Sequence, residues 1–195
     1  MVDFMCGRFT LRNIKKIKED FGVEREPSFN ISPGQSILTV HKKIEIMRWY
    51  FNPEWAKKPM NLINARSETL HEKPSFRDAR RCVIPVDGWY EWFRQDGKKK
   101  PYFFHNNNDL FLFAAIYSSY KGENGCALVT KNANDNLQRI HHRMPVLLGY
   151  KEAKSWINGD DNYNSELSES TEFYPVSDFV NSPGNNNEIC IESLD

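Results

Sequence analysis

Hydrophobic and polar residues follow one another in short runs along this chain, and most of these runs predict strands. A helical pattern stands out only near the start, where apolar side chains recur at helical spacing at Leu11, Ile14, Ile17 and Phe21. Thr10 can cap the beginning of such a helix, and Gly22 suits its C-terminal turn. The sequence therefore predicts an amphipathic helix over residues 10–21.

Apolar or alternating runs of four to eight residues predict a series of strands. They cover residues 36–41, 43–50, 82–86, 88–94, 101–105, 110–117 and 127–130. In residues 43–50 the alternation runs through Ile44 and Ile46, and Asp96-Gly97 is a strong hairpin signal.

The C-terminal third predicts shorter elements. We expect a helical turn over residues 135–140, a strand over 144–148 and a short helix over 151–157. Residues 158–172 are polar and acidic, which predicts a mobile surface loop, and residues 173–176 and 188–191 are expected to pair back onto the sheet. Many short strands with few helices indicate one α+β domain, mainly antiparallel β and barrel-like, with a few peripheral helices.

Composition fits a soluble globular protein, with 195 residues of which 27% are charged and 13% aromatic. No apolar run approaches the roughly 20 residues that span a bilayer, and residues 1–5 do not resemble a signal peptide. We therefore expect a cytoplasmic protein with no membrane partner, and we also expect a monomer.

The four cysteines lie far apart, at Cys6, Cys82, Cys126 and Cys190. Without a C-x-x-C pair or a secretion signal they predict free thiols, not disulfides or a zinc site. Cys82 and Cys126 lie within apolar runs and are expected to be inert core residues. No metal and no cofactor is expected.

The net charge is zero but unevenly distributed. Residues 151–195 carry a balance of −8, and residues 1–150 carry +8. A basic body with an acidic tail is compatible with binding a polyanion, although most such surfaces are only solvated.

Cys6 lies directly after Met5 near the start of the chain. A cysteine that becomes the first residue carries a thiol and a free α-amine on adjacent carbons. The amine can attack an aldehyde to give an imine, and the thiolate can close on the imine carbon to give a thiazolidine. Reference pKa values of about 7.7–8.0 for the amine and 8.5 for the thiol leave usable fractions unprotonated near neutral pH. Inside the chain, the same cysteine would be an ordinary buried thiol.

Four segments concentrate polar groups where strands end: a turn-rich loop over residues 30–35, residues 64–68, residues 88–92 and residues 141–145. In the third, Glu91 is placed among three aromatic residues of the sequence. Each segment also has a structural interpretation. Glu91 can face outward on an edge strand, Asn30 and Asn64 can cap turns, and the arginines can form surface ion pairs.

Together with Cys6, these segments resemble the SOS-response-associated peptidase family of abasic-site processing proteins, from Cys6 to about Ile191. The markers are Met5-Cys6-Gly7-Arg8-Phe9, Asn30-x-x-Pro33-Gly34, Trp55 ahead of Ile63-Asn64-Ala65-Arg66-x-Glu68-Thr69, Gly88-Trp89-Tyr90-Glu91-Trp92, Ile140-His141-x-Arg143-x-Pro145 and Pro175-Val176-Ser177.

The resemblance implies binding of single-stranded DNA and a thiazolidine cross-link between the N-terminal cysteine and the ring-opened sugar of an abasic site. It implies that Cys6 is the nucleophile, Asn64 holds the cysteine terminus and the sugar, Glu91 is general acid/base and His141 assists ring opening. Implied DNA contacts are Arg8, Asn30, Pro33, Arg66, Trp92 and Arg143. Aromatic neighbours would raise the pKa of a buried Glu91.

Two departures from the family pattern matter. Residues 1–4 precede Met5, so we expect residues 1–5 to be an extension, absent or removed in the active form, before a domain over residues 6–195. His142 lies beside the motif histidine, and spacing to Arg143 and Pro145 assigns the role to His141. The alternatives are a thiol peptidase using Cys6, His141 and Asn64, and a non-catalytic single-strand-binding module.

Overall fold

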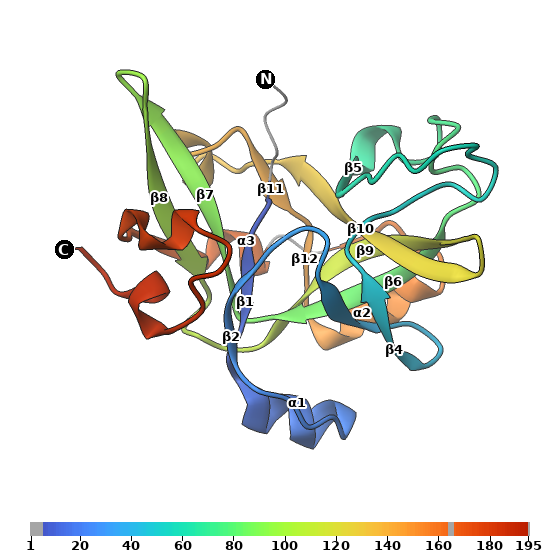
Figure 1. The fold of residues 1–195 in the computed structure, drawn as a ribbon, viewed down its shortest axis with the longest axis horizontal. Helices are drawn as coiled ribbons and strands as arrows, with labels where there is room; N and C mark the ends of the chain where they lie inside the picture. Colours follow the sequence, from blue (N-terminus) through green and yellow to red (C-terminus); the bar gives the residue numbers. More distant parts are fainter. Residues whose placement is uncertain (1–5, 164–165, 195) are drawn as a thin grey trace.

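The computed structural model describes residues 6–163 and 166–194, which form two packed sheets (Figure 1). One sheet has the order β13-β8-β7-β1-β2, and the other has the order β11-β10-β4-β3-β6-β9-β12, with β5 added on β10. The strands are β1 Phe9–Leu11, β2 Ser28–Ile31, β3 Ser36–Val40, β4 Ile44–Arg48, β5 Asn64–Arg66, β6 Arg80–Val86, β7 Gly88–Gln95, β8 Lys98–His105, β9 Phe111–Tyr120, β10 Glu123–Asn132, β11 Arg143–Pro145, β12 Leu147–Leu148 and β13 Glu172–Pro175.

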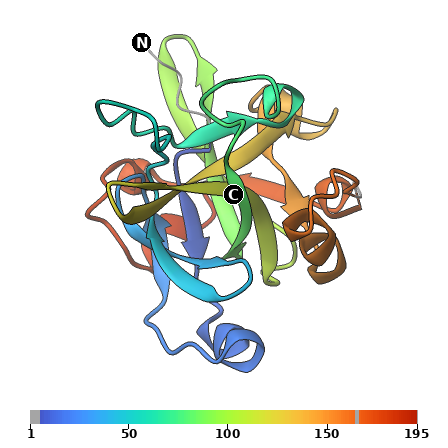
Figure 2. The same cartoon turned by 90° about the vertical axis from the view of Figure 1, so that its right-hand side faces the viewer.

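The second sheet closes on itself because β10 pairs both with β4 and with β9. Most pairings are antiparallel, and β10 pairs in parallel with β4 and β5. The mainly antiparallel, barrel-like fold is therefore confirmed. Figure 2 shows the strands curving around a common interior, with the helices on the periphery. The helices are α1 Ile14–Phe21, α2 Tyr150–Ile157 and α3 Glu166–Glu169.

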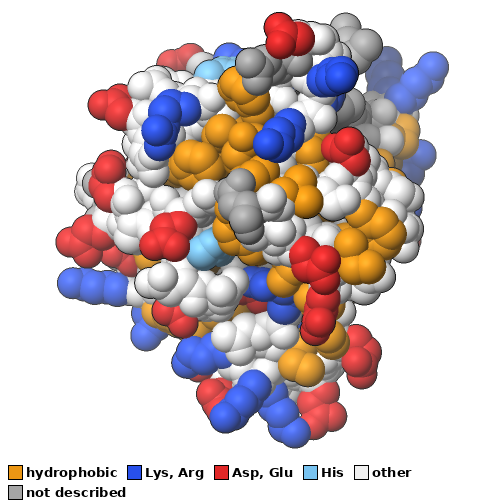
Figure 3. Space-filling model, turned by 90° about the vertical axis from the view of Figure 1, so that its left-hand side faces the viewer, with side chains coloured by type: hydrophobic (Ala, Val, Ile, Leu, Met, Phe, Trp, Pro, Cys, Tyr) orange, Lys and Arg blue, Asp and Glu red, His pale blue; other side chains and the backbone are white. Residues whose placement is uncertain are grey.

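The core is aromatic where the two sheets meet. Trp89 of β7 stacks on Phe104 of β8 with ring centroids 5.1 Å apart, and Phe113 of β9 meets Trp89 edge-on at 6.0 Å. A second cluster lies under α2, whose Trp156 donates its indole N–H to Cys82 O of β6. Figure 3, viewed from the β8 side, shows hydrophobic side chains gathered on the surface with Lys and Arg side chains among them.

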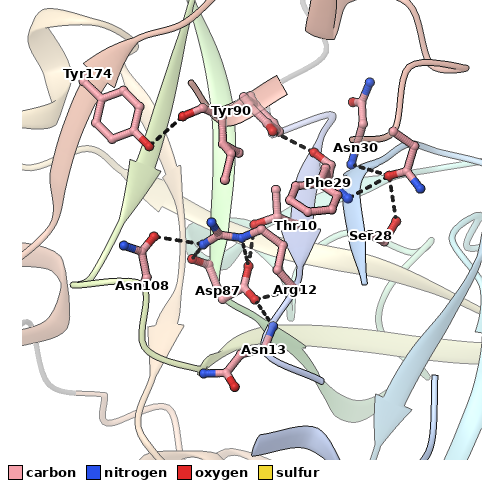
Figure 4. Close-up of polar contacts among 12 residues, drawn as sticks. Thr10, Arg12, Asn13, Ser28, Phe29, Asn30, Asp87, Tyr90, Asn108 and Tyr174 are labelled. Carbon is pink, nitrogen blue, oxygen red and sulfur yellow. Dashed lines mark hydrogen bonds and ion pairs between the residues drawn. The ribbon is translucent and has the colours of Figure 1, made fainter. Parts of the chain in front are cut away.

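The first predicted helix is wrong in its N-terminal part, because Phe9–Leu11 forms β1 and α1 begins only at Ile14. Buried Asp87 holds this boundary (Figure 4). Its carboxylate accepts hydrogen bonds from the Thr10 hydroxyl at 2.6 Å and from the backbone N–H of Asn13 at 2.7 Å. Asn13, not Thr10, caps the helix, and Gly22 ends it in the left-handed conformation as predicted.

Most predicted strands are confirmed, and Asp96 and Gly97 turn the β7–β8 hairpin at φ 51° and 74°, as a two-residue turn requires. The alternation through Ile44 and Ile46 does not mark the buried face of β4. Ile44 and Ile46 are 41% and 58% exposed, whereas Met47 is buried. β2 and β5 were not among the predicted strands.

The C-terminal region departs further from the predictions. Residues 188–191 form a 3₁₀ turn, Glu188–Ile191, capped by the Asn187 side chain, and not a strand. The predicted loop over residues 158–172 contains α3, and its residues 164–165 lie outside the described residues. The prediction for residues 144–148 splits into β11 and β12.

Candidate active site

Cys6 and Glu91 meet in the interior, although 85 positions separate them in sequence. The backbone N of Cys6 donates to Glu91 Oε1 at 3.0 Å, and Cys6 Sγ donates to the same oxygen at 2.7 Å. Both residues are buried, at 1% and 3% exposure. The strand that follows Cys6 fixes this meeting, because β1 pairs with β7 through Phe9 and Trp89. One carboxylate oxygen thus contacts both groups that an N-terminal cysteine can use as nucleophiles.

Burial raises the pKa of the Cys6 thiol well above its ordinary value, because the thiolate would lose its hydration. The neighbouring Glu91 charge and hydrogen bond raise it further, and Arg143 acts in the opposite direction. The thiol is therefore held protonated with its proton directed at Glu91. This geometry makes Glu91 the group that can accept the proton when Sγ becomes a nucleophile.

Strand alternation separates the aromatic residues around Glu91. Trp89 lies two positions before it on the same face of β7, and Tyr102 lies opposite it on β8. Tyr90 and Trp92 belong to the other face, where Tyr90 packs into a cluster with Val180 and Cys190. The sequence interpretation that all three rings flank the carboxylate is therefore wrong for Tyr90 and Trp92.

β10 brings together residues from two separate motifs. β5 pairs with it in parallel, placing Asn64 beside Leu128 and Arg66 beside Thr130. β11 pairs on the other side through Arg143. Arg66 is exposed, while Asn64 is half-buried. The topology therefore collects an amide and two guanidinium groups at one end of a central strand.

Arg143 is buried at 4% exposure, and its guanidinium is engaged by the protein. It forms two parallel bonds with Glu68, at 2.6 Å and 2.9 Å, and donates to Thr130 O at 2.7 Å. The guanidinium also holds the pKa of Glu68 below its ordinary value through this hydrogen bond. Sequence reasoning included Glu68 in a motif without giving it a role, and its place two residues after Arg66 was the available signal.

The two adjacent histidines stack at a centroid distance of 4.6 Å. His141 is half-buried and its Nδ1 lies 3.2 Å from the backbone N of Arg143, whereas His142 is exposed. The thiol of Cys6 meets Glu91, so the geometry favours a thiol–carboxylate pair over the thiol–imidazole pair of the peptidase alternative.

Arg8 and Asn30 lie against the C-terminal segment, residues 178–191. Asn30 is buried, and its Nδ2 donates to the carbonyls of Val180, Ser182 and Asn185 at 2.8–3.1 Å. Arg8 Nη1 donates to Asn30 Oδ1 at 2.9 Å and to Val180 O at 2.8 Å. Figure 4 shows Asn30 beside Phe29, whose carbonyl accepts from the Tyr90 hydroxyl. In this structure, both side chains hold the C-terminal segment to the sheet.

The remaining two predicted contacts are more peripheral. Trp92 is half-buried and donates its indole N–H to Asn181 Oδ1 at 2.7 Å. Pro33 is half-buried in the turn before β3. Within the described part of the chain, no three His, Cys, Asp or Glu side chains lie together as a metal site, and the four cysteines are free and buried. Among those residues, no helix has the length and apolar character to cross a membrane.

Comparison with known proteins places this chain in a family. The model of the SOS response associated peptidase (SRAP) family matches residues 5–183. The abasic site processing protein YoqW of Bacillus subtilis (strain 168) is 38% identical over 97% of this chain and 100% of its own length. The abasic site processing protein YedK of Escherichia coli (strain K12) is 30% identical over 78% of this chain and 79% of its own.

The fold recurs among solved structures. A protein from Bacteroides thetaiotaomicron superposes with a TM-score of 0.72 at 21% identity, covering 98% of both chains. With a family model matched over most of its length, the chain belongs to the SOS response associated peptidase (SRAP) family.

Proposed function

We propose that this protein binds single-stranded DNA and forms a thiazolidine between Cys6 and the ring-opened sugar of an abasic site, shielding the lesion. The observation that carries the proposal is the double contact of Glu91 Oε1 with the N and Sγ of Cys6. Those are the two atoms that a thiazolidine joins to one carbon. The names of YoqW and YedK support an abasic site as the substrate.

The reaction needs several proton transfers near one carbon. The closed sugar opens when a proton leaves O1′ and another reaches O4′, which exposes an aldehyde at C1′. The α-amine of Cys6 adds to C1′, and loss of water gives the imine. Sγ then bonds to C1′, and its proton is transferred to the imine nitrogen, so one water is released overall. A carboxylate beside both N and Sγ can carry these protons.

The other proposed roles come from the motif positions that the chain shares with the family. Asn64 would hold the cysteine terminus and the sugar, and His141 would assist ring opening. Exposed Arg66 would bind a phosphate beside the lesion. Buried Arg143 would reach a second phosphate by giving up part of its pairing with Glu68. The protein would act as a monomer in the cytoplasm.

The amine must be free for this chemistry, so we also propose that residues 1–5 are absent or removed from the active form. The backbone favours cleavage before Cys6, since this non-glycine residue has a φ of 44°, in the strained left-handed region. Sγ would attack the Met5 carbonyl carbon, the C–N bond would break as nitrogen takes a proton, and water would hydrolyse the thioester. Glu91 would accept the thiol proton.

The test uses a single-stranded oligonucleotide with one abasic site and time courses on denaturing gels. Cys6→Ala should abolish the covalent product at all times. Glu91→Gln should slow cross-linking by roughly 10²–10⁴-fold while non-covalent binding persists, because it removes only proton transfer. His141→Ala should also slow the reaction, with His142→Ala as the matched control.

Intact mass of each preparation defines the reacting terminus. We expect loss of residues 1–5 from protein that cross-links. Cross-linking by protein that retains them, or a wild-type rate in Glu91→Gln, would contradict the thiazolidine mechanism. DNA binding by Cys6→Ala together with no covalent product from the wild type would instead assign a non-catalytic binding module.

A further inference from the structure

A half-exposed aromatic face continues outward from Glu91 along the β7–β8 hairpin. Phe93 lies two positions further along β7 on the Glu91 face, about 6.6 Å away at the usual strand rise. Tyr102 lies directly opposite Glu91 on β8, and Phe173 of β13 lies opposite Phe104. The three rings of this aromatic face, Phe93, Tyr102 and Phe173, are each only partly buried.

These rings form a connected series. Tyr102 meets Phe93 edge-on at 6.4 Å between centroids and Phe173 at 6.0 Å. Three adjoining sheet strands hold them, so their spacing is fixed by backbone pairing. A rigid set of rings with open edges or faces is what sequence-tolerant base stacking needs.

Positive charges border the same rings. Lys100 Nζ lies 5.7 Å from the centre of the Tyr102 ring, and the Arg139 guanidinium lies 5.7 Å from that of Phe173. Both cationic residues are exposed, and Lys98 is exposed on the same face of β8. Figure 3 shows Lys and Arg side chains among the hydrophobic ones on this side. An aromatic surface bordered by cations suits a single nucleic-acid strand, with bases on the rings and phosphates at the cations.

We propose that this aromatic face binds the unpaired bases on one side of the abasic nucleotide. The inference rests on the proposed function, since the face is continuous with Glu91 and would receive the strand leaving the site. It assigns binding roles to Phe93, Tyr102 and Phe173, with phosphate contacts at Lys100 and Arg139. Trp92, an implied DNA contact, lies on the opposite face of β7, so the inference places base stacking on these rings and not on Trp92.

The test pairs a protein change with a DNA change. The double substitution Phe93→Leu and Tyr102→Leu removes two rings while retaining apolar bulk. Tyr150→Leu is the control, because Tyr150 is 42% exposed on α2, away from the hairpin. The DNA carries one abasic site, and stable base-free nucleotides replace the neighbouring bases on its 5′ side, its 3′ side or neither. Affinity is measured by fluorescence anisotropy with Cys6→Ala protein, so that no covalent bond forms.

For Cys6→Ala protein with the aromatic face unchanged, removing the bases on one side of the lesion should weaken DNA binding by about 10-fold or more, and removing those on the other side should not. The double variant should bind equally well with and without those bases. The Tyr150→Leu variant should lose affinity on base removal to the same extent as the protein with the unchanged aromatic face. Lys100→Ala should lower the slope of log binding constant against log salt concentration by about 0.7, because one phosphate contact is lost. Equal sensitivity of all variants to base removal would overturn the proposal. Self-association that the double variant abolishes, with unchanged DNA affinity, would assign the face to a second copy.

Failure of the proposed function would give a different result from failure of this inference. In that case, wild-type protein would give no Cys6-dependent cross-link with any oligonucleotide, whatever bases flank the lesion. Cross-linking that persists while base removal has no side-specific effect would overturn the inference alone.

Discussion

At the scale of single residues, the two arginines of the site differ in whether the guanidinium is free to meet a ligand or is already bound within the protein. Arg66 is exposed at the end of β5, whereas the buried guanidinium of Arg143 is held by Glu68 and Thr130. The guanidinium of Arg143 already forms two parallel hydrogen bonds with the Glu68 carboxylate, and these bonds hold β11 in place. Arg66 is therefore the better probe of direct phosphate contact.

Arg66→Ala should reduce the salt dependence of single-strand binding. Removing one phosphate contact lowers the log–log slope by about 0.7, because one fewer set of counterions is released. Lys15→Ala is the control, since Lys15 is exposed on α1, away from the site. Anisotropy titrations at several salt concentrations measure the slope. An unchanged slope for Arg66→Ala would remove this residue from the interface.

Single residues also show which parts of the candidate site can be identified from local sequence. Cys6, Glu91, Asn64 and Arg66 could be chosen from motifs, and the structure brings Cys6 and Glu91 into contact. The neighbours of Glu91 could not be chosen from proximity in sequence, because adjacent residues of a strand point to opposite faces. Tyr102, its cross-strand partner, is recognisable only once the hairpin register is known.

At the scale of elements, strands with strong local patterns were predictable and boundaries set by distant residues were not. The apolar run of β6 and the Asp96-Gly97 turn contain their own signals. The spacing of Leu11, Ile14 and Ile17 suits a helix equally well, but β1 forms because Asp87, 77 positions away, bonds Thr10. No local pattern contains that contact.

Asp87→Asn should therefore destabilise the junction of β1 and α1. Arg12 Nε lies 2.9 Å from Asp87 Oδ1, and its side chain is only 15% exposed, so loss of the carboxylate leaves a largely buried cation. We expect a loss of about 3 kcal/mol in the free energy of unfolding. Urea unfolding measures it, with Glu24→Gln as a control because the Lys18–Glu24 pair is exposed. Equal stability of the two variants would contradict the anchoring role of Asp87.

At the scale of the whole molecule, strand density predicted a barrel-like fold, but the order of pairing did not follow from it. Closure depends on β10 pairing with both β9 and β4, and β10 also pairs with β5 and β11. The structure of the C-terminal segment could not be predicted from its local sequence either, because side chains from the first strands hold its 3₁₀ turns. Asn30, expected at the DNA, is the main donor to that segment.

Asn30→Asp tests whether the two ends of the chain are held together in this way. The substitution retains an acceptor for Arg8 but replaces the amide that donates to three backbone carbonyls. Unsatisfied buried acceptors cost about 1–3 kcal/mol, so residues 178–191 should open before the sheets do. Hydrogen exchange should rise in that segment alone, with Asn108→Asp as an exposed control. Because the segment packs on the Tyr90 face of β7 and Glu91 lies on the other, Cys6–Glu91 chemistry should persist in the folded variant. Unchanged exchange over residues 178–191, combined with weaker DNA binding, would return Asn30 to the DNA interface that its motif predicts.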